Sequence, residues 1–377
     1  MIKFYIFIIT LFVCHVTFAQ TLPKPDHIVI VLEENRDYSE IVSSSLAPYI
    51  NSLLTDTNTA VFTDANALVS GSQPNYLMLY SGSDQGVSGS TITSVQFTTC
   101  NLGASLIAGG YSFTSYSEDL PSVGFLGTTS GNYARKHNPS SNWQGTSTNQ
   151  LAPAANMPFS AFPTHFDSLP TVSIVVPNLI DDMHTPADST AITPGDTWLH
   201  NNLGAYIQWA KTHNSMLMFA FDESSSSTSE HILIFFIGQG VKGGYYGESL
   251  DWYRMLRTME DMYHLPYCGN STSATPVKSC WSTFQSGVKS NTIQENAINV
   301  WPIPARGSLN FSIKSAASDD VYVSVIDQLG RIVKKTEIKI TAGENDFKMD
   351  MQDVNAGIYF IKVQGETTNS FKKAVIE

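Results

Sequence analysis

The stretch His27-Ile28-Val29-Ile30-Val31-Leu32 is a continuous run of apolar, mostly β-branched side chains, and it ends abruptly in Glu33-Glu34-Asn35-Arg36-Asp37. Unbroken apolar runs of this length are typical of strands that are buried on both faces of a parallel sheet. The runs 172–176 and 216–221 show the same pattern and are also followed by acidic residues. The sequence therefore predicts an α/β domain with a central, mostly parallel sheet flanked by helices.

Polar residues that are suited to chemistry follow each of these three predicted strands. In chain order they are Glu34, Asn35, Asp182, His184, Asp222 and Glu223. Ligands of open α/β sheets bind beyond the carboxyl ends of the strands, so these side chains are expected to converge at one edge. A polar loop is the simpler interpretation of any one segment, but the recurrence after three strands favours a site.

A candidate nucleophile lies in the segment Ser70-Gly71-Ser72-Gln73-Pro74-Asn75, a turn flanked by glycine and proline just before an apolar helical run. Free backbone N–H groups at a helix N-terminus favour an anion, so a serine placed there can receive a phosphoryl group. For the isolated motif, helix capping by Ser72 is the simpler interpretation. The acidic segments after the predicted strands favour the nucleophile.

The composition restricts the classes of partner. The chain has 377 residues, enough for about two domains, and a formal net charge of −12. This charge argues against a nucleic-acid backbone as partner. An acidic protein that acts on phosphate esters needs local positive charge, which a metal ion supplies most simply.

Residues 1–19 have the pattern of a secretory signal peptide. Lys3 precedes a short apolar run over 4–13, and small residues precede Gln20. The run is too short to span a membrane, and no later stretch is long and apolar enough to do so. We therefore expect an exported chain without a transmembrane segment after cleavage.

The four cysteines divide between the signal peptide and the mature chain. Cys14 lies in the signal peptide. Cys268 and Cys280 bracket a short loop rich in Gly, Ser, Thr and Pro, and we expect them to form a disulfide in an oxidising compartment. Cys100 is then the odd cysteine.

The chain divides into segments of different pattern. We expect a catalytic domain over 20–285, a polar linker over 286–297 and a small antiparallel β-sandwich over 298–377, where apolar residues alternate with period two. Within the catalytic domain, Gly195 and Asp196 are expected to cap the start of an amphipathic helix, and a second helix is expected over 252–263.

Residues from about 27 to 281 resemble the bacterial phosphoesterase family, which includes metal-dependent acid phosphatases and phospholipases C within the alkaline phosphatase superfamily. The matching motifs are Glu-Glu-Asn at 33–35, Ser-Gln-Pro-Asn-Tyr-Leu at 72–77, Tyr-Ser-Glu-Asp-Leu-Pro at 116–121, Arg-Lys-His-Asn-Pro at 135–139, Val-Pro-Asn-Leu through Asp-Asp-Met-His at 176–184, Gly-Asp-Thr-Trp-Leu at 195–199, Phe-Asp-Glu at 221–223 and Leu-Arg-Thr-Met-Glu-Asp-Met-Tyr at 256–263. The resemblance implies an alkaline phosphatase-like fold and a phosphoserine intermediate.

The resemblance also implies roles for individual residues. The implied metal ligands are Glu34, Asn35, Ser72, Asp182, Asp222, Glu223 and His231, with Ser72 also the nucleophile. Asn75, His137 and His184 are implied as donors to the phosphate oxygens or the leaving group, and Asp182 alternatively orients a histidine. Oxygen ligands suit Ca²⁺, Mg²⁺ or Mn²⁺, whereas histidine ligands favour Zn²⁺ or Fe.

Two features of this chain depart from the pattern of the family that it resembles. Relatives often carry Asn-His-Tyr before the second helix, where this chain has Asp251-Trp252-Tyr253, and His231 follows Glu230 in a serine-rich segment. The substrate is expected to be a small phosphate ester or a phospholipid. The alternatives are a phospholipase C or other phosphodiesterase, and an inactive surface-binding protein on the same fold.

The last segment resembles the C-terminal sorting domain of the type IX secretion system. It opens with Trp301-Pro302-Ile303-Pro304, where that family usually has Tyr-Pro-Asn-Pro, and it ends with the chain. The resemblance implies the type IX secretion machinery as a partner and the surface or surroundings of a Gram-negative bacterium as the location. An accessory binding sandwich is the alternative.

Overall fold

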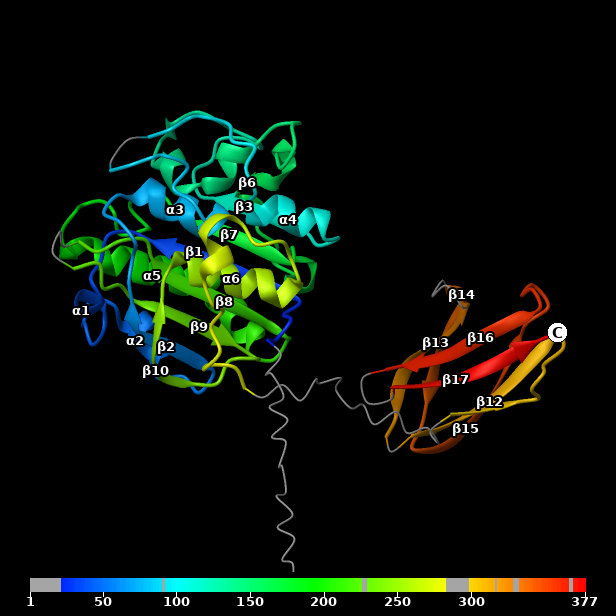
Figure 1. The fold of residues 1–377 in the computed structure, drawn as a ribbon. Helices are drawn as coiled ribbons and strands as arrows, with labels where there is room; N and C mark the ends of the chain where they lie inside the picture. Colours follow the sequence, from blue (N-terminus) through cyan, green and yellow to red (C-terminus); the bar gives the residue numbers. More distant parts are fainter. Residues whose placement is uncertain are drawn as a thin grey trace, which may run out of the picture. The chain divides into compact units, whose positions relative to one another are not determined.

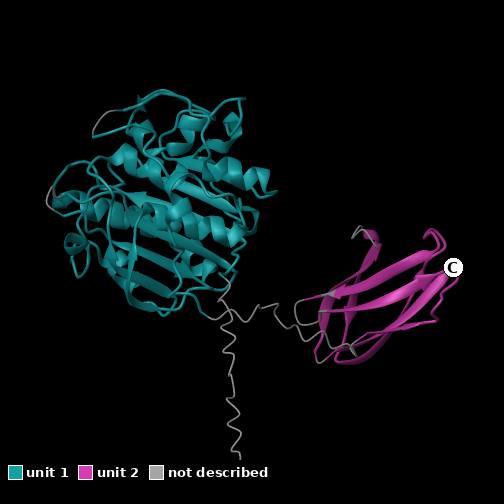
Figure 2. Ribbon diagram, viewed as in Figure 1, with its two compact units in different colours: residues 1–284 teal, residues 285–377 magenta. Residues whose placement is uncertain are grey.

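The structure is a computed structural model that describes residues 22–89, 92–225, 229–282, 298–315, 317–327, 332–365 and 369–377. The chain divides into two units, residues 1–284 and residues 285–377 (Figures 1 and 2). The signal peptide expected over 1–19 and the linker expected over 286–297 lie outside the described residues.

An eight-stranded sheet forms the centre of the first unit, with the strand order β10-β2-β9-β8-β1-β7-β3-β6. Its strands are β1 (His27–Glu33), β2 (Thr59–Ala65), β3 (Phe113–Ser117), β6 (Asn156–Pro158), β7 (Val172–Val176), β8 (Ser215–Phe221), β9 (Ile234–Gly238) and β10 (Gly244–Leu250). β1 lies between β7 and β8 and is parallel to both, whereas β9 is antiparallel to β2 and β8. The predicted mostly parallel sheet is confirmed, and β1, β3, β7 and β8 end at one edge.

Helices form two groups around this sheet. The α-helices are α1 (Tyr38–Ile41), α2 (Pro48–Leu54), α3 (Ser72–Ser81), α4 (Leu102–Ala108), α5 (Ile192–Ala210) and α6 (Trp252–Tyr263). α3, α4 and α6 contact one another, and α2 contacts α5. Every residue of β8 is buried, so both faces of the sheet are covered (Figure 1). Among the described residues, no helix has the length and apolarity needed to cross a membrane.

Short elements complete the first unit. The 3-10 helices are η1 (Arg135–His137), η2 (Pro139–Trp143), η3 (Pro153–Ala155), η4 (Phe159–Ala161), η5 (Phe166–Ser168), η6 (Ser189–Ala191) and η7 (Gly269–Ser273), and β4 (Thr129–Ser130) pairs with β5 (Tyr133–Ala134). All of these except η6 and η7 lie in the Gly-, Ser- and Asn-rich region between α3 and β7, where many hydrogen bonds are made by side chains.

The start of α5 differs from the sequence-based prediction. The helix begins at Ile192, so Asp196 lies inside it and not at its N-cap. The Asp196 carboxylate accepts hydrogen bonds from the backbone N–H groups of Tyr49 and Ile50, at 3.0 and 2.7 Å. These are first-turn N–H groups of α2, so Asp196 caps a neighbouring helix and ties α2 to α5.

The expected disulfide between Cys268 and Cys280 is wrong. Cys268 is bonded to Cys100, with a Cα–Cα distance of 5.3 Å, and Cys280 is a buried free cysteine. The fold brings Cys100, which precedes α4, beside Cys268, which follows α6, because α4 packs against α6. The backbone carbonyl of Cys280 instead accepts a hydrogen bond from Lys242 between β9 and β10.

The second unit consists of two antiparallel sheets, ordered β11-β12-β15 and β14-β13-β16-β17. Its strands are β11 (Ile298–Trp301), β12 (Ser308–Ser315), β13 (Asp319–Asp327), β14 (Ile332–Ile340), β15 (Gly343–Asp350), β16 (Gly357–Gln364) and β17 (Asn369–Ile376). Alternate residues such as Val321, Val323 and Val325 are buried in its own hydrophobic core, as the period-two pattern predicts.

Candidate functional site

The N-terminus of α3 is preceded by a turn that requires glycine. Gly71 has a φ of 128°, and a Cβ there would lie 2.6 Å from the backbone oxygen of Gly89. Ser72 follows as the first residue of α3 and is 6% exposed. Its Oγ donates to Glu34 Oε2 at 2.8 Å and lies 3.1 Å from Glu223 Oε1, while the Gly71 N–H donates to the other oxygen of Glu223. The turn thus presents the serine hydroxyl to two carboxylates.

Glu34 is fully buried directly after β1 and is held from two sides. The hydroxyl of Tyr76, one turn after Ser72 on α3, donates to Glu34 Oε1 at 2.6 Å. The same oxygen lies 3.0 Å from His137 Nε2. Burial by itself raises the pKa of Glu34, but the charge and hydrogen bond of His137 outweigh it and lower the pKa to about 2. Glu34 is therefore anionic.

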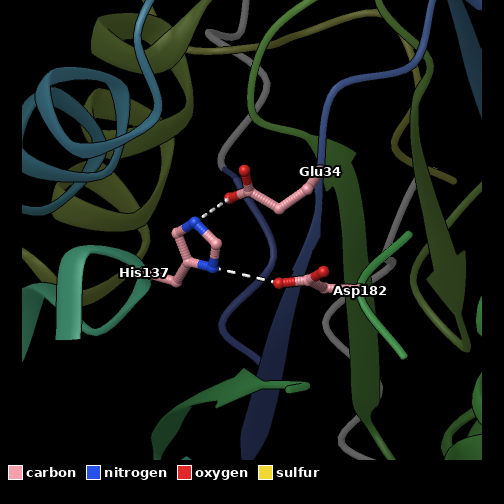
Figure 3. Close-up of side chains that lie close together, drawn as sticks. All are labelled: Glu34, His137 and Asp182. Atoms are coloured by element: carbon pink, nitrogen blue, oxygen red, sulfur yellow. Dashed lines mark hydrogen bonds and ion pairs between the residues drawn. The ribbon is translucent and has the colours of Figure 1, made fainter. Parts of the chain in front are cut away.

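His137 bridges two carboxylates (Figure 3). Its Nδ1 lies 3.0 Å from Asp182 Oδ2, while its Nε2 faces Glu34. Burial by itself lowers the pKa of His137, but the charge of Glu34 and the hydrogen bonds to both carboxylates outweigh it and raise the pKa to about 9. Asp182, His137, Glu34 and Ser72 thus form a continuous chain of polar contacts. The ligand atoms of Glu34, His137 and Asp182 also lie within 4.8 Å of one another, close enough to share an ion.

A second set of oxygens at Ser72 fits a metal ion. Asp222 Oδ1 accepts from the backbone N–H groups of Asn35 and Glu223, at 3.0 and 2.7 Å. Asp222 Oδ2 and Asn35 Oδ1 are buried and accept no hydrogen bond from the residues that the structure describes. Burial, together with the charges of Glu34 and Glu223, raises the pKa of Asp222. Buried oxygens without donors are costly unless a cation binds them, and all-oxygen sets suit Ca²⁺, Mg²⁺ or Mn²⁺.

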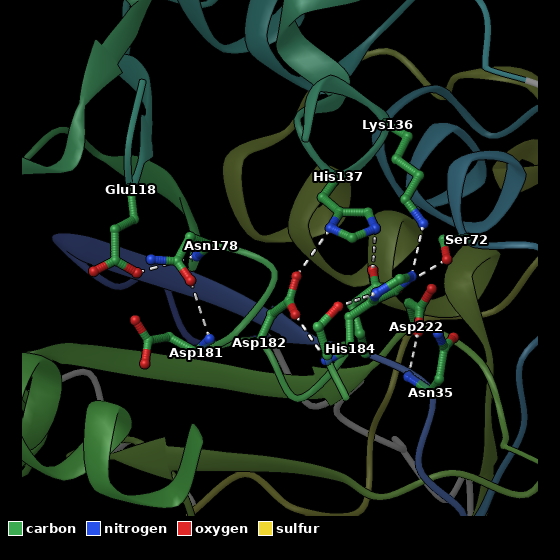
Figure 4. A network of polar contacts seen from close by, with 12 residues as sticks. Asn35, Ser72, Glu118, Lys136, His137, Asn178, Asp181, Asp182, His184 and Asp222 are labelled. Carbon is green, nitrogen blue, oxygen red and sulfur yellow. Dashed lines mark hydrogen bonds and ion pairs between the residues drawn. The ribbon is translucent and has the colours of Figure 1, made fainter. Parts of the chain in front are cut away.

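A cavity of about 270 Å³ lies over Ser72 and is also lined by Asn35, Glu223, Lys136 and His184. The Lys136 Nζ lies 3.1 Å from His184 Nε2, above the Ser72 and Asp222 side chains (Figure 4). Burial lowers the pKa of His184 to about 4, with Lys136 acting in the same direction against the charge of Glu34. His184 is therefore neutral beside a cationic ammonium group.

Asn75 lies behind the turn and not on the cavity. It is fully buried, and its Oδ1 accepts from the Trp252 Nε1 at 2.8 Å and the Leu68 N at 3.3 Å. Its Nδ2 donates to the carbonyl oxygens of Val69 and Gly71, at 2.7 and 3.1 Å. Both ends of the amide thus hold the turn that carries the serine.

His231 lies outside this group of contacts. Its ring stacks on Tyr38 with a centroid distance of 4.6 Å, and its Nε2 lies 3.1 Å from the backbone oxygen of Thr63. The structure therefore brings together most of the sequence-predicted site residues, namely Glu34, Asn35, Ser72, His137, Asp182, His184, Asp222 and Glu223. His231 instead supports the start of the segment that leads into β9.

Sequence reasoning missed Tyr76 and Lys136. Tyr76 follows Ser72 by one helical turn, and this spacing could have indicated that both side chains face the same partner. Lys136 stands between Arg135 and His137 in a motif from which only the histidine was selected. Its charge beside a predicted phosphate site was the signal that could have identified it.

Comparisons with known proteins match both units of the chain to known families. Residues 44–266 match the phosphoesterase family, and residues 299–377 match a secretion system C-terminal sorting domain. A phosphatidylinositol-3-phosphatase of Mycobacterium tuberculosis is 40% identical over 265 residues, which make up 70% of this chain and 85% of that protein. A probable acid phosphatase of Kluyveromyces lactis is 25% identical over an alignment of 255 residues that covers 64% of this chain and 58% of that protein.

Solved structures include a protein in the alkaline phosphatase superfamily from Vibrio parahaemolyticus. Its alignment covers 88% of this chain and 81% of that one, with 12% identity and a TM-score of 0.49.

Proposed function

Because the chain belongs to the phosphoesterase family, we propose that it is a secreted, metal-dependent phosphatase in which Ser72 takes up the phosphoryl group of the substrate. The observation that carries this proposal is the placement of Ser72. It begins α3, lines the cavity and contacts the carboxylates of Glu34 and Glu223.

The residues of the chain support two successive displacements at phosphorus. Ser72 Oγ forms a bond to phosphorus as the bond to the leaving oxygen breaks, and one of its two carboxylate neighbours accepts the hydroxyl proton. Backbone N–H groups at the start of α3 favour the anionic phosphate. Water then attacks the phosphoserine, which releases inorganic phosphate and restores the hydroxyl.

We propose that Glu34, Asn35, Asp222 and Glu223 hold a divalent metal ion together with Ser72. A bound divalent cation lowers the pKa of a coordinated hydroxyl and neutralises charge on phosphate oxygens. The buried Asp222 Oδ2 and Asn35 Oδ1 supply acceptors that suit it. His137 and Asp182 would orient Glu34 from below, as outer groups commonly do for metal ligands.

The relatives suggest a substrate class, and the C-terminal domain suggests the pathway by which the protein is exported. The name of the Mycobacterium tuberculosis relative suggests a phosphoinositide monophosphate as one substrate to test. The sorting domain over 299–377 indicates type IX secretion to the cell surface or beyond. We further propose that residues 1–19 are the signal peptide that starts this export.

Replacing Ser72 with alanine tests the proposal. We expect S72A to lower kcat/KM for p-nitrophenyl phosphate by at least about 10³-fold, because the nucleophile is lost. The matched control is S70A, which removes an exposed serine two residues away and should keep activity within about twofold. Mass spectrometry of the acid-quenched wild-type reaction should locate a phosphate on the peptide that contains Ser72.

Further measurements separate the alternatives. EDTA should abolish the activity and added divalent ions should restore it, whereas full activity of S72A would refute the nucleophile. Faster turnover of bis-p-nitrophenyl phosphate than of the monoester would indicate a phosphodiesterase. Absence of turnover and of bound metal would indicate an inactive binding protein.

A further inference from the structure

The cavity over Ser72 needs positive charge on the side that faces the substrate. Glu34, Asp222 and Glu223 surround the serine, and a phosphate monoester itself carries nearly two negative charges at neutral pH. Of the described residues that line the cavity, Lys136 is the one lysine or arginine. The cavity is thus acidic around the serine and basic at Lys136.

Neither histidine of the site offers a free N–H group to this cavity. His137 is 1% exposed, and its two nitrogens lie 3.0 Å from oxygens of Asp182 and Glu34. The ammonium of Lys136 can only donate, so His184 Nε2 at 3.1 Å accepts and carries no proton. His184 Nδ1 lies 3.0 Å from Thr185 Oγ1. Lys136, whose ammonium has three N–H groups, is therefore better placed than either histidine to donate to a phosphate in this cavity.

Lys136 is held in place by buried neighbours on both sides in η1. The guanidinium of Arg135 donates to the backbone oxygens of Leu126 and Ser141, at 2.6 and 3.1 Å. His137 is fixed between its two carboxylates. Only the middle side chain of the three is directed to the cavity, so its cation is positioned before a substrate arrives.

We propose that Lys136 binds the doubly charged phosphate group of a monoester and that His184 is a positioning residue that holds the ammonium over the cavity. The inference rests on the proposed function and adds a substrate class to it. A diester carries one negative charge fewer and has one oxygen blocked by its second ester group. Lys136 therefore selects monoesters over diesters.

The test compares one monoester with one diester in charge variants of Lys136. We expect K136M to lower kcat/KM for p-nitrophenyl phosphate by about 10²-fold, as for the loss of a charged donor to a phosphate oxygen. The loss for bis-p-nitrophenyl phosphate should stay below about tenfold, and inhibition by inorganic phosphate should weaken in K136M. K136R, which keeps the charge, should retain part of the monoester preference.

A matched lysine variant controls for the overall charge. Lys242 is exposed on the same unit and does not line the cavity, so K242M should leave both kcat/KM values within about twofold of wild type. Thermal unfolding should give similar Tm values for K136M, K242M and wild type, because Lys136 is only partly buried and Lys242 is exposed.

Variants of His184 test the positioning role. H184Q keeps a side-chain oxygen that can accept from Lys136, whereas H184A removes the acceptor. We expect H184A to raise KM for the monoester by about tenfold. H184Q should bring KM most of the way back to the wild-type value. The double variant K136M/H184A should be no worse than K136M, because His184 acts through the lysine.

Equal losses for monoester and diester in K136M, or no loss for either, would overturn the inference. So would an additive loss in the double variant. These outcomes differ from failure of the proposed function, in which wild-type turnover would not depend on Ser72. In that case, binding of inorganic phosphate to S72A and S72A/K136M, measured by calorimetry, still decides whether Lys136 binds the anion.

Discussion

Two groups of acidic side chains lie beyond the carboxyl ends of the parallel strands and differ in the residues that face them. The first group is Glu34, Asp222 and Glu223 around Ser72, and the second is Glu118, Asp119 and Asp181 around Asn178. Glu34, after β1, faces the imidazole of His137, and its pKa falls to about 2 although burial opposes this. Glu118, after β3, accepts a hydrogen bond from the backbone N–H of Asn178 at 3.1 Å. Burial raises the pKa of Glu118 to about 7, and the neighbouring charge of Asp181 acts in the same direction.

The comparison teaches that a carboxylate at the sheet edge is made functional by the groups that face it. In Figure 4, Lys136, His137 and His184 lie on the side of Ser72 and Asp222, whereas Glu118 and Asp181 gather around the amide of Asn178. The first group combines cations, a hydroxyl and buried oxygens without donors. The second group is held by hydrogen bonds of Asn178 that link the segment after β3 to the segment after β7.

The largest expected effect comes from breaking the first group at Asp222. D222N has the same shape but replaces one of the carboxylate oxygens with an amide donor, which repels a cation. We expect kcat/KM for p-nitrophenyl phosphate to fall by about 10²- to 10³-fold and bound metal, measured by plasma mass spectrometry, to be lost. D119N, at an exposed position of the second group, is the matched control and should retain both.

Retention of metal and activity in D222N would contradict the assignment of this carboxylate to the metal. Loss of metal with D119N as well would show that the two groups act together, which would remove the contrast between them.

Much of this first group could be predicted from the sequence. The apolar runs of β1, β7 and β8 indicated buried parallel strands, and a parallel arrangement necessarily gathers Glu34, Asp182 and Asp222 at one edge. The glycine before Ser72 indicated the turn. These predictions rest on local patterns that the fold preserves.

The rest depended on contacts between distant segments. The pairing of Cys100 with Cys268 follows from the packing of α4 against α6, which no spacing reveals. The direction of the Asp196 carboxylate toward α2 could not be inferred from its own helix. The charge of Lys136 is visible in the sequence, but its contact with the His184 nitrogen could not be inferred from it.

A smaller effect is expected at His137, which supplies the positive charge under Glu34. H137N keeps a short polar side chain near Asp182 but removes the imidazolium between the carboxylates. We expect kcat/KM to fall by about 10- to 100-fold, as for outer groups that orient metal ligands. H213N, which changes an exposed histidine near the end of α5, should leave activity within about twofold.

The contacts of His137 with Glu34 and Asp182 should also affect the thermal stability of the metal-free protein. The pKa of His137 is raised from 6.5 to about 9, so its stabilising charge is complete below pH 6.5 and is lost as the pH rises through about 9. In EDTA, the Tm difference between wild type and H137N should therefore be larger at about pH 6 than at about pH 10. A difference that grows with pH would contradict the imidazolium between Glu34 and Asp182.

The smallest effect on activity is expected at Glu118, where the second group can be neutralised without a change of shape. E118Q should keep kcat/KM within about twofold, because Glu118 faces Asn178 and not Ser72. Its pKa is raised from 4.5 to about 7, so the cost of its charge in the folded protein is absent below pH 4.5 and complete above about pH 7. Glutamine stays neutral, so E118Q should raise Tm by about 1 to 3 °C at pH 8 and hardly change it at about pH 4.5. A loss of activity beyond tenfold would place Glu118 in the catalytic group and show that the charge contrast between the two groups does not divide catalytic from structural carboxylates.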